Sequence, residues 1–320
     1  MSVDRWGHAM ARKMDPSPES IAAAERAAAA ARIHQNAGTS YLPPGNETGA
    51  ISRAITPRTP GEGDTARKAI EGHWLAHGGA DGPLGNPTNG AQLLVLDNEG
   101  GRASAYEGGS IYWWPDIGPQ TVSKVVVRYR GMNCFHETNR FSGSDEPYFI
   151  LGYQGDTGSG TLNPIQYDDV DAGGSFPYPI AEVYSGNPGK GLLLPAVLME
   201  HDEGDPAHYH TLVATAVGTA AGLTVAAVAL IVSVGAGAVA APLVTAAVPF
   251  LIEALDGAIG SAEDFIDQAV LAISARQLLT TWQQPLQYER DVEYDLATPL
   301  LSGQGGAYKA YFDIELYSWD

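Results

Sequence analysis

Hydrophobic and polar residues alternate in short runs over much of the second half of this chain, but one long run has no charged residue. It extends from Thr211 to Ile252 and is rich in Ala, Val, Gly and Leu. Gly235, Gly237 and Pro242 lie near its middle, so the pattern predicts two helices joined by a tight turn. Each helix approaches the roughly 20 residues that span a bilayer. Such a hairpin is either buried within a domain or stored for membrane insertion.

Apolar runs on both sides of this segment predict β-strands. Residues 125–129, 148–153 and 192–200 are short and mostly apolar. Apolar and polar residues alternate over 308–317, which predicts a strand with one buried face. Because strands precede and follow the uncharged run, we expect residues 207–282 to be a helical insertion in an antiparallel β-sandwich.

Small residues characterise the predicted insertion. Gly218 and Gly222 form a G-x-x-x-G pair, which lets helices approach closely in lipid. Threonines at a spacing of four also give the first helix a weakly polar stripe, which suits packing on protein. Residues 261–264 resemble a capping box and predict a third, amphipathic helix that ends near Trp282. A buried structural hairpin, conditional membrane insertion and an oligomer contact all remain open.

Shifts in composition divide the rest of the chain. Residues 1–38 are Ala-rich and predict a helical arm, whereas residues 39–63 are rich in Gly, Pro, Thr and Asn and predict a flexible linker. Residues 64–120 predict a compact module, and residues 121–320 predict the sandwich. The expected elements of the module are a helix over 65–77 and strands around 93–96 and 110–113.

Charge and cysteine content narrow the function classes. The 18 Lys and Arg residues against 37 Asp and Glu residues give a net charge of −19, which argues against nucleic-acid binding. The single cysteine, Cys134, excludes an internal disulfide. Residues 1–8 have no apolar segment of a Sec signal peptide. We therefore expect a product that is cytoplasmic as synthesised, or that is released or injected to act at a cell envelope.

Aromatic, Gly and Pro residues of the module follow an ordered pattern. The runs H-W-L-A, G-G, L-G-N-P and Y-E-G-G-S-I-Y-W begin at residues 73, 78, 84 and 106. Their order and spacing resemble one LGFP repeat, with the pattern (W/Y)-x-x-x-G-G…L-G-x-P…(F/Y)-x-G-G-x-I-Y-W. Asn86 replaces the usual Phe of that family. The resemblance implies an envelope-associated actinobacterial protein that the module holds to the cell wall.

The aromatic residues of this pattern have two candidate roles. They could stack on sugar rings, with cell-wall polysaccharide or another envelope glycan as the partner, or they could form the core of the module. Only one copy of the pattern is visible, so avidity from repetition is absent. The candidate ligand-binding residues are Trp74, Tyr106, Tyr112 and Trp113.

Acidic side chains gather between residues 136 and 205, where twelve Asp and Glu residues face two basic residues. Carboxylates at loop tips repel one another unless a cation compensates, and Ca²⁺ takes six to eight oxygen ligands. The alternatives are carboxylates that cap turns, and a transition-metal site that includes His201, His208 and His210. The candidate calcium ligands are Glu137, Asp145, Glu200, Asp202 and Asp205.

Two known loops resemble these acidic stretches. The run G-S-D-E-P-Y at 143–148 is similar to the G-x-S-D-P-Y loop of C2 domains, with Glu146 inserted. Together with residues 134–138 and 198–206, it resembles more closely a bacterial domain of the type E-T…G-S-D-E-P-Y…L-M-E-x-D-x-G-D-P, found on varied secreted proteins. The uncharged run is similar in composition and length to the hairpin of pore-forming colicins.

Motifs for catalysis are weak. The chain has no G-x-S-x-G elbow and no phosphate-binding loop. Cys134 and His136 share a strand face, but free cysteines are usually buried and inert. Whether the chain is an enzyme stays open, with an envelope hydrolase as the third hypothesis.

We therefore expect an α+β fold: a small LGFP-like module plus a C2-like antiparallel β-sandwich with an inserted helical hairpin. The leading hypothesis is a non-enzymatic, calcium-dependent, cell-envelope-targeted protein. Its hairpin would enter a membrane conditionally, as in a toxin or effector. The alternative is a structural or interaction subunit of a larger assembly, phage-tail-like or part of an injection system, with the hairpin permanently buried.

Overall fold

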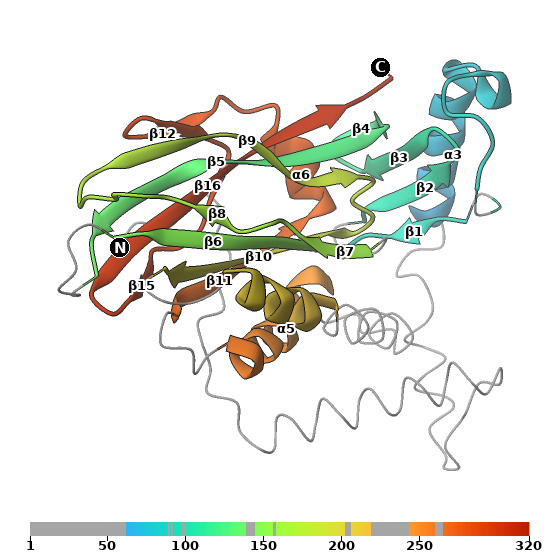
Figure 1. Ribbon diagram of the computed structural model, residues 1–320. Coiled ribbons are helices and arrows are strands. Elements are labelled where there is room, and N and C mark those ends of the chain that lie inside the picture. The colour runs from blue at the N-terminus through green and yellow to red at the C-terminus, as the bar shows by residue number, and fades with distance from the viewer. Residues whose placement is uncertain are drawn as a thin grey trace, which may run out of the picture.

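Two antiparallel sheets stacked face to face form the body of the protein, with a small module at one end and helices against the lower sheet (Figure 1). This arrangement confirms the α+β class. The predicted arm (1–38), nearly all of the linker (39–63) and residues 219–242 lie outside the described residues. The computed structural model describes residues 62–88, 90, 92–97, 100–138, 145–155, 158–201, 206–218, 243–259 and 265–319.

The small module consists of helices α3 (Glu62–Ala76) and η1 (Gly79–Asp81) and a four-stranded sheet. Ala66 and Ile70 of α3 pack against Ile111 and Trp113 of the sheet. The predicted helix and both predicted strands of this module are confirmed. The strands, in sheet order, are β1 (Leu94–Val95), β2 (Arg102–Tyr106), β3 (Gly109–Trp114) and β4 (Gly118–Val122).

The sandwich pairs one sheet of order β14-β16-β5-β9, with β15 beside β16, and another of order β11-β10-β6-β7, with β8 beside β6. The four strands predicted for the sandwich, three from apolar runs and one from alternation, are all present. The bounds are β5 (Lys124–His136), β6 (Pro147–Gly155), β7 (Gly158–Thr161), β8 (Ile165–Gln166), β9 (Ser175–Gly186), β10 (Gly191–Glu200), β11 (Phe265–Ser274), β14 (Leu296–Ala297), β15 (Leu301–Gly303) and β16 (Gly306–Tyr317).

Strand β10 explains why one stretch of the sequence is apolar without alternation. Leu194 and Leu198 face the core between the two sheets. Leu193, Val197 and Met199 point to the opposite face, where helices cover them. A strand that is buried on both faces has no solvent side and needs no polar positions.

Two helices cover this outer face of the sheet. Residues 206–218 are helical, and α5 (Leu243–Ile259) follows the undescribed segment. Val213 and Val217 of the first helix, and Leu251 and Leu255 of α5, are buried against β6, β10 and β11. Among the helices of the described residues, none is long and apolar enough to cross a membrane. Both described ends of the uncharged run therefore pack on the sandwich.

The prediction of a third helix over 261–282 is wrong for residues 265–274, which form β11. A register shift beside Met199 places two residues of β11 where one would fit a regular ladder. Beyond the bulge, Ala269, Leu271 and Ile273 face the core between the sheets, whereas Val270 and Ala272 face the covering helices. The run is therefore apolar without alternation, and such a run cannot be distinguished from a buried helix by periodicity alone. The helix there is α6 (Ala275–Thr281), which begins at Ser274 with a capping box to Gln277.

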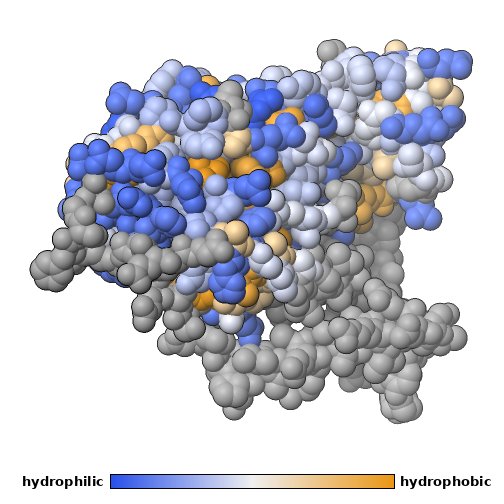
Figure 2. All heavy atoms as spheres, viewed as in Figure 1, coloured by the Kyte–Doolittle hydropathy of each residue, from blue (hydrophilic) through white to orange (hydrophobic). Residues whose placement is uncertain are grey.

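Strand β16 also differs from its predicted pattern of one buried face. Tyr308 and Phe312 face the core as expected, but Tyr311 and Asp313 on the other face are buried too. The hairpin of β12 (Gln287–Glu289) and β13 (Val292–Tyr294) lies against this face. Its Tyr294 ring packs 4.8 Å from the Tyr311 ring. Figure 2 shows a hydrophilic surface over the left end of the sandwich and apolar side chains along its middle.

Candidate functional site

The aromatic residues predicted to bind a ligand pack mainly inside the molecule. Trp74 stacks on Tyr106 at 5.9 Å, and its indole N–H donates to Gly85 O at 3.0 Å. Tyr106 and Trp113 belong to the core of the module, and Tyr112 is only 1% exposed. The interpretation of Tyr112 as a sugar-stacking ring is therefore corrected, since neither face of a buried ring is open to a ligand.

Polar contacts join the module to the sandwich. The Tyr112 hydroxyl donates to Asn187 Oδ1 at 2.7 Å, and the Asn187 amide donates back to Ser110 Oγ. Arg276 of α6 pairs with Asp116 at 3.0 Å on the module. The buried Trp114 packs in the same core as the sandwich residues. One face of the module's sheet thus packs in the core of the sandwich, while its other face packs on α3.

Asp145, the central predicted calcium ligand, is 3% exposed and accepts hydrogen bonds from protein donors. Its Oδ2 accepts from the Thr138 N–H at 2.6 Å and from the Tyr308 hydroxyl. Its Oδ1 accepts from the Thr138 hydroxyl at 2.7 Å. Both lone pairs of Oδ2 are therefore occupied. This geometry is that of a structural carboxylate that fixes a loop to β16.

The other acidic candidates make separate contacts. Glu137 accepts from the Ala172 N–H at 2.6 Å, and the buried Glu200 accepts from the Glu146 N–H at 2.8 Å. Within the part of the chain that the structure describes, no three His, Cys, Asp or Glu side chains form a group that could hold a metal ion. Asp202 and Asp205 lie outside the described residues, so calcium binding stays a prediction.

Cys134 lies beside the Asp145 cluster. Burial raises the pKa of its thiol from the usual 9.0 to about 12, and the nearby Asp145 and Glu137 carboxylates add to this shift. Burial and the hydrogen bond to Asp145 also raise the pKa of Tyr308. Both groups stay protonated at neutral pH. A protonated, buried thiol is a poor nucleophile, so this cluster supports folding rather than chemistry.

The hairpin residues fall mainly outside the described segments. Gly218 ends the described part of the first helix, and a Cβ atom added there would meet none of the described residues within 4 Å. Gly222, Gly235, Gly237 and Pro242 lie in the undescribed segment. Close helix approach at the G-x-x-x-G pair therefore stays a prediction.

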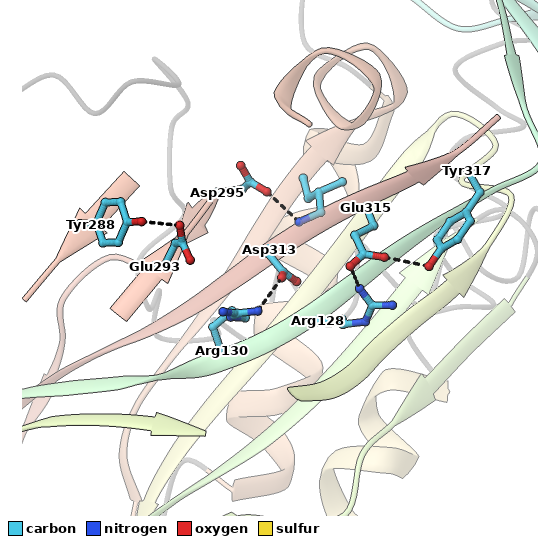
Figure 3. A network of polar contacts seen from close by, with 9 residues as sticks. Arg128, Arg130, Tyr288, Glu293, Asp295, Asp313, Glu315 and Tyr317 are labelled. Carbon is cyan, nitrogen blue, oxygen red and sulfur yellow. Dashed lines mark hydrogen bonds and ion pairs between the residues drawn. The ribbon is translucent and has the colours of Figure 1, made fainter. Parts of the chain in front are cut away.

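A row of ion pairs follows the outer face of β5 and β16 (Figure 3). Arg130 pairs with Asp313 at 3.1 Å, and Arg128 pairs with Glu315. Tyr317 donates from its hydroxyl to Glu315 Oε2 at 2.8 Å, which extends the row to the end of β16. In the sequence these positions are recognisable only as the polar side of a strand, because cross-strand pairing depends on register.

Comparison with known proteins identifies one part of the chain. Residues 84–132 match the LGFP repeat. The LGFP repeat is a cell-surface-associated family, which is compatible with an envelope-associated protein that is not an enzyme. No curated protein and no solved structure matches the chain. The match continues beyond β4 into β5, so the LGFP repeat contributes a strand to the sandwich as well as the small sheet.

Gly108 is the position of the LGFP repeat where a side chain fits worst. A Cβ atom there would lie 2.1 Å from Pro83 O and 3.2 Å from Leu84 Cα. We expect Gly108→Ala to lower the free energy of unfolding by about 2–4 kcal/mol, because backbone would have to shift. Chemical denaturation measures this difference. The matched control is Gly72→Ala in α3, where the new methyl group meets nothing within 4 Å; equal stability of the two variants would contradict the prediction.

Proposed function

We propose that this chain is a non-enzymatic envelope protein whose LGFP repeat attaches it to cell-wall polysaccharide or another envelope glycan. The observation that carries the proposal is the match at residues 84–132, which covers the small sheet and continues into β5. Attachment through the repeat would hold the sandwich at the same surface.

The joint between the repeat and the sandwich supports this proposal. Tyr112 and Asn187 hydrogen-bond across it, and Arg276 pairs with Asp116. Trp114 packs in the core that continues into the sandwich. When a module docked in this way binds a ligand, it also fixes the position and orientation of the sandwich. Free tumbling on a linker would leave the sandwich unoriented at the wall.

Sedimentation with purified actinobacterial cell walls tests the proposal. We expect the full chain to appear in the pellet and to be released by soluble wall glycan. A chain that stays in the supernatant at low and moderate salt, with and without Ca²⁺, would refute attachment. Comparison of the samples with and without Ca²⁺ tests calcium dependence, since the proposed loop site predicts more protein in the pellet when Ca²⁺ is present.

A second candidate is an interaction subunit of a larger assembly with the helices permanently buried. The packing of Val213, Val217, Leu251 and Leu255 against the sheet favours it over conditional membrane insertion. Liposome leakage at neutral and low pH separates the two ideas. Permanent burial predicts no leakage, whereas a toxin or effector that inserts its hairpin predicts leakage under at least one condition.

A further inference from the structure

Two large aromatic side chains are exposed where the sandwich meets the LGFP repeat. Tyr317 ends β16 and is 39% exposed, and Trp319 follows two residues later at 50% exposure. The aromatic rings of the repeat itself are mostly buried in cores. A ligand that stacks on this end of the molecule therefore meets Tyr317 and Trp319 before it meets the rings of the repeat.

Polar contacts hold both rings in place. The Tyr317 hydroxyl donates to Glu315, and the Lys124 ammonium lies 4.5 Å from the centre of the Tyr317 ring. The Trp319 indole N–H donates to Gly108 O at 3.1 Å. Because these contacts restrict the side chains before any ligand arrives, binding loses little side-chain entropy. Lys124 covers one face of the Tyr317 ring, so a ligand could stack only on the opposite face of that ring. The polar atoms of both rings already have hydrogen-bond partners.

The polar groups beside Tyr317 suit hydroxyl groups of a ligand. Glu315 offers a half-exposed carboxylate, which forms an ion pair with Arg128 of the neighbouring strand β5 (Figure 3). Burial alone would raise the pKa of Glu315, but hydrogen bonds from Tyr317 and Arg128 lower it below the usual value. The carboxylate is therefore ionised at neutral pH and accepts hydrogen bonds. Lys124 adds an exposed donor.

The surface belongs to the LGFP repeat as well as to the sandwich. Gly108 and Lys124 both lie within the matched residues 84–132. Ser123, between β4 and β5, donates from its N–H to Tyr317 O at 2.8 Å and from its hydroxyl at 3.0 Å. The end of β16 is thus tied to the repeat at two points, Ser123 and Gly108.

We propose that Tyr317 and Trp319 form a stacking surface for pyranose rings of an envelope glycan, with Glu315 and Lys124 as partners for the sugar hydroxyls. A sugar ring combines an apolar carbon face with hydroxyl donors and acceptors, as this surface does. A purely apolar partner would bury the Arg128–Glu315 pair without replacing its water contacts, which is costly. A polyanion is disfavoured by the net charge of −19. The inference rests on the proposed attachment to glycan and names the residues that perform it.

The experiment compares four full-length proteins for sedimentation with purified cell walls: wild type, Trp319→Ala, Tyr317→Ala and Trp282→Ala. Trp282 is the matched control, because it is 43% exposed and lies at the end of α6. We expect the affinity to fall about tenfold in each of the first two variants and to change less than twofold in the control. Trp319→Phe keeps a ring and should retain most of the affinity. Thermal unfolding verifies that each variant is folded.

The outcomes are distinguishable. Wild-type binding that Trp319→Ala and Tyr317→Ala leave unchanged would overturn this surface and leave attachment by the repeat intact. Absence of wild-type binding would overturn both proposals. A change of oligomeric state in the two variants, measured by sedimentation velocity, would show that the surface contacts a second copy of the chain and would also overturn the glycan assignment. A selective loss of wall binding in folded, monodisperse variants supports it.

Discussion

Replacement of Asp145 with alanine is expected to lower the free energy of unfolding by about 3–5 kcal/mol. The carboxylate accepts from the Thr138 N–H, the Thr138 hydroxyl and the Tyr308 hydroxyl, and it is almost completely buried. Alanine would leave these three donors without an acceptor in a site that water enters poorly. A buried donor without a partner costs its full desolvation penalty, because its hydrogen bond to water is not replaced by one within the protein.

Urea denaturation of four variants measures this effect and its cause. Glu146→Ala is the matched control, since Glu146 is the adjacent exposed carboxylate, and it should change stability by less than about 0.5 kcal/mol. Tyr308→Phe removes one donor from the cluster. The double variant with Asp145→Ala should lose less than the sum of the two single variants, because the residues act through one contact.

A fifth variant, Asp145→Asn, distinguishes a structural carboxylate from a calcium-binding one. Titration calorimetry with Ca²⁺ should give the same heat for wild type and for a folded Asp145→Asn protein if Asp145 is structural. Asn keeps one acceptor and nearly the same shape, so it is less disruptive than Ala. Unchanged stability of Asp145→Ala together with loss of calcium heat would return Asp145 to the predicted metal site.

The sequence predicts the sandwich strands β5, β6, β10 and β16 because each is a short apolar run or an alternating one. It misses β9 and β11, which are equally long. Residues 192–200 have no polar alternation, and β10 is buried on both faces. The same reasoning fails at β11, where residues 269–273 are apolar on both faces and follow a capping-box-like start that favours a helix. Burial of both faces depends on the elements that pack on the strand, which residue spacing within one segment cannot reveal.

Side-chain roles are harder to predict than strands, because they depend on contacts between distant segments. The LGFP-like pattern made Tyr112 a candidate for ligand binding. In the structure it is buried between the module and the sandwich, where it hydrogen-bonds Asn187, which is 75 residues away in the sequence. Asp145 likewise belongs to an acidic loop in sequence and to a hydrogen-bonded cluster with Tyr308 in space. Tyr317 and Trp319 follow a strand pattern that carries no functional signal. Their exposure becomes visible only after the strand is placed.

Cys134 is expected to react with a thiol reagent at least about a thousandfold more slowly in the native protein than in the unfolded chain at pH 8. The thiolate is the reacting species. A rise of the thiol pKa from 9.0 to about 12 lowers the fraction of thiolate at pH 8 about a thousandfold. The side chain is also fully buried on β5. Reaction therefore requires a local opening that separates β5 from its neighbours.

Reaction with a coloured disulfide reagent, followed with and without denaturant, measures this ratio. Ala76→Cys supplies the control, because residue 76 is exposed at the end of α3, and its thiol should react at once while Cys134 stays protected. The raised pKa has a second consequence. The unfolded chain loses the thiol proton near pH 9, before the folded protein does, so the stability supplied by this group falls as the pH rises from about 9 to about 12. Rapid native labelling of one thiol per chain in the wild-type protein would contradict burial and make Cys134 a candidate nucleophile again.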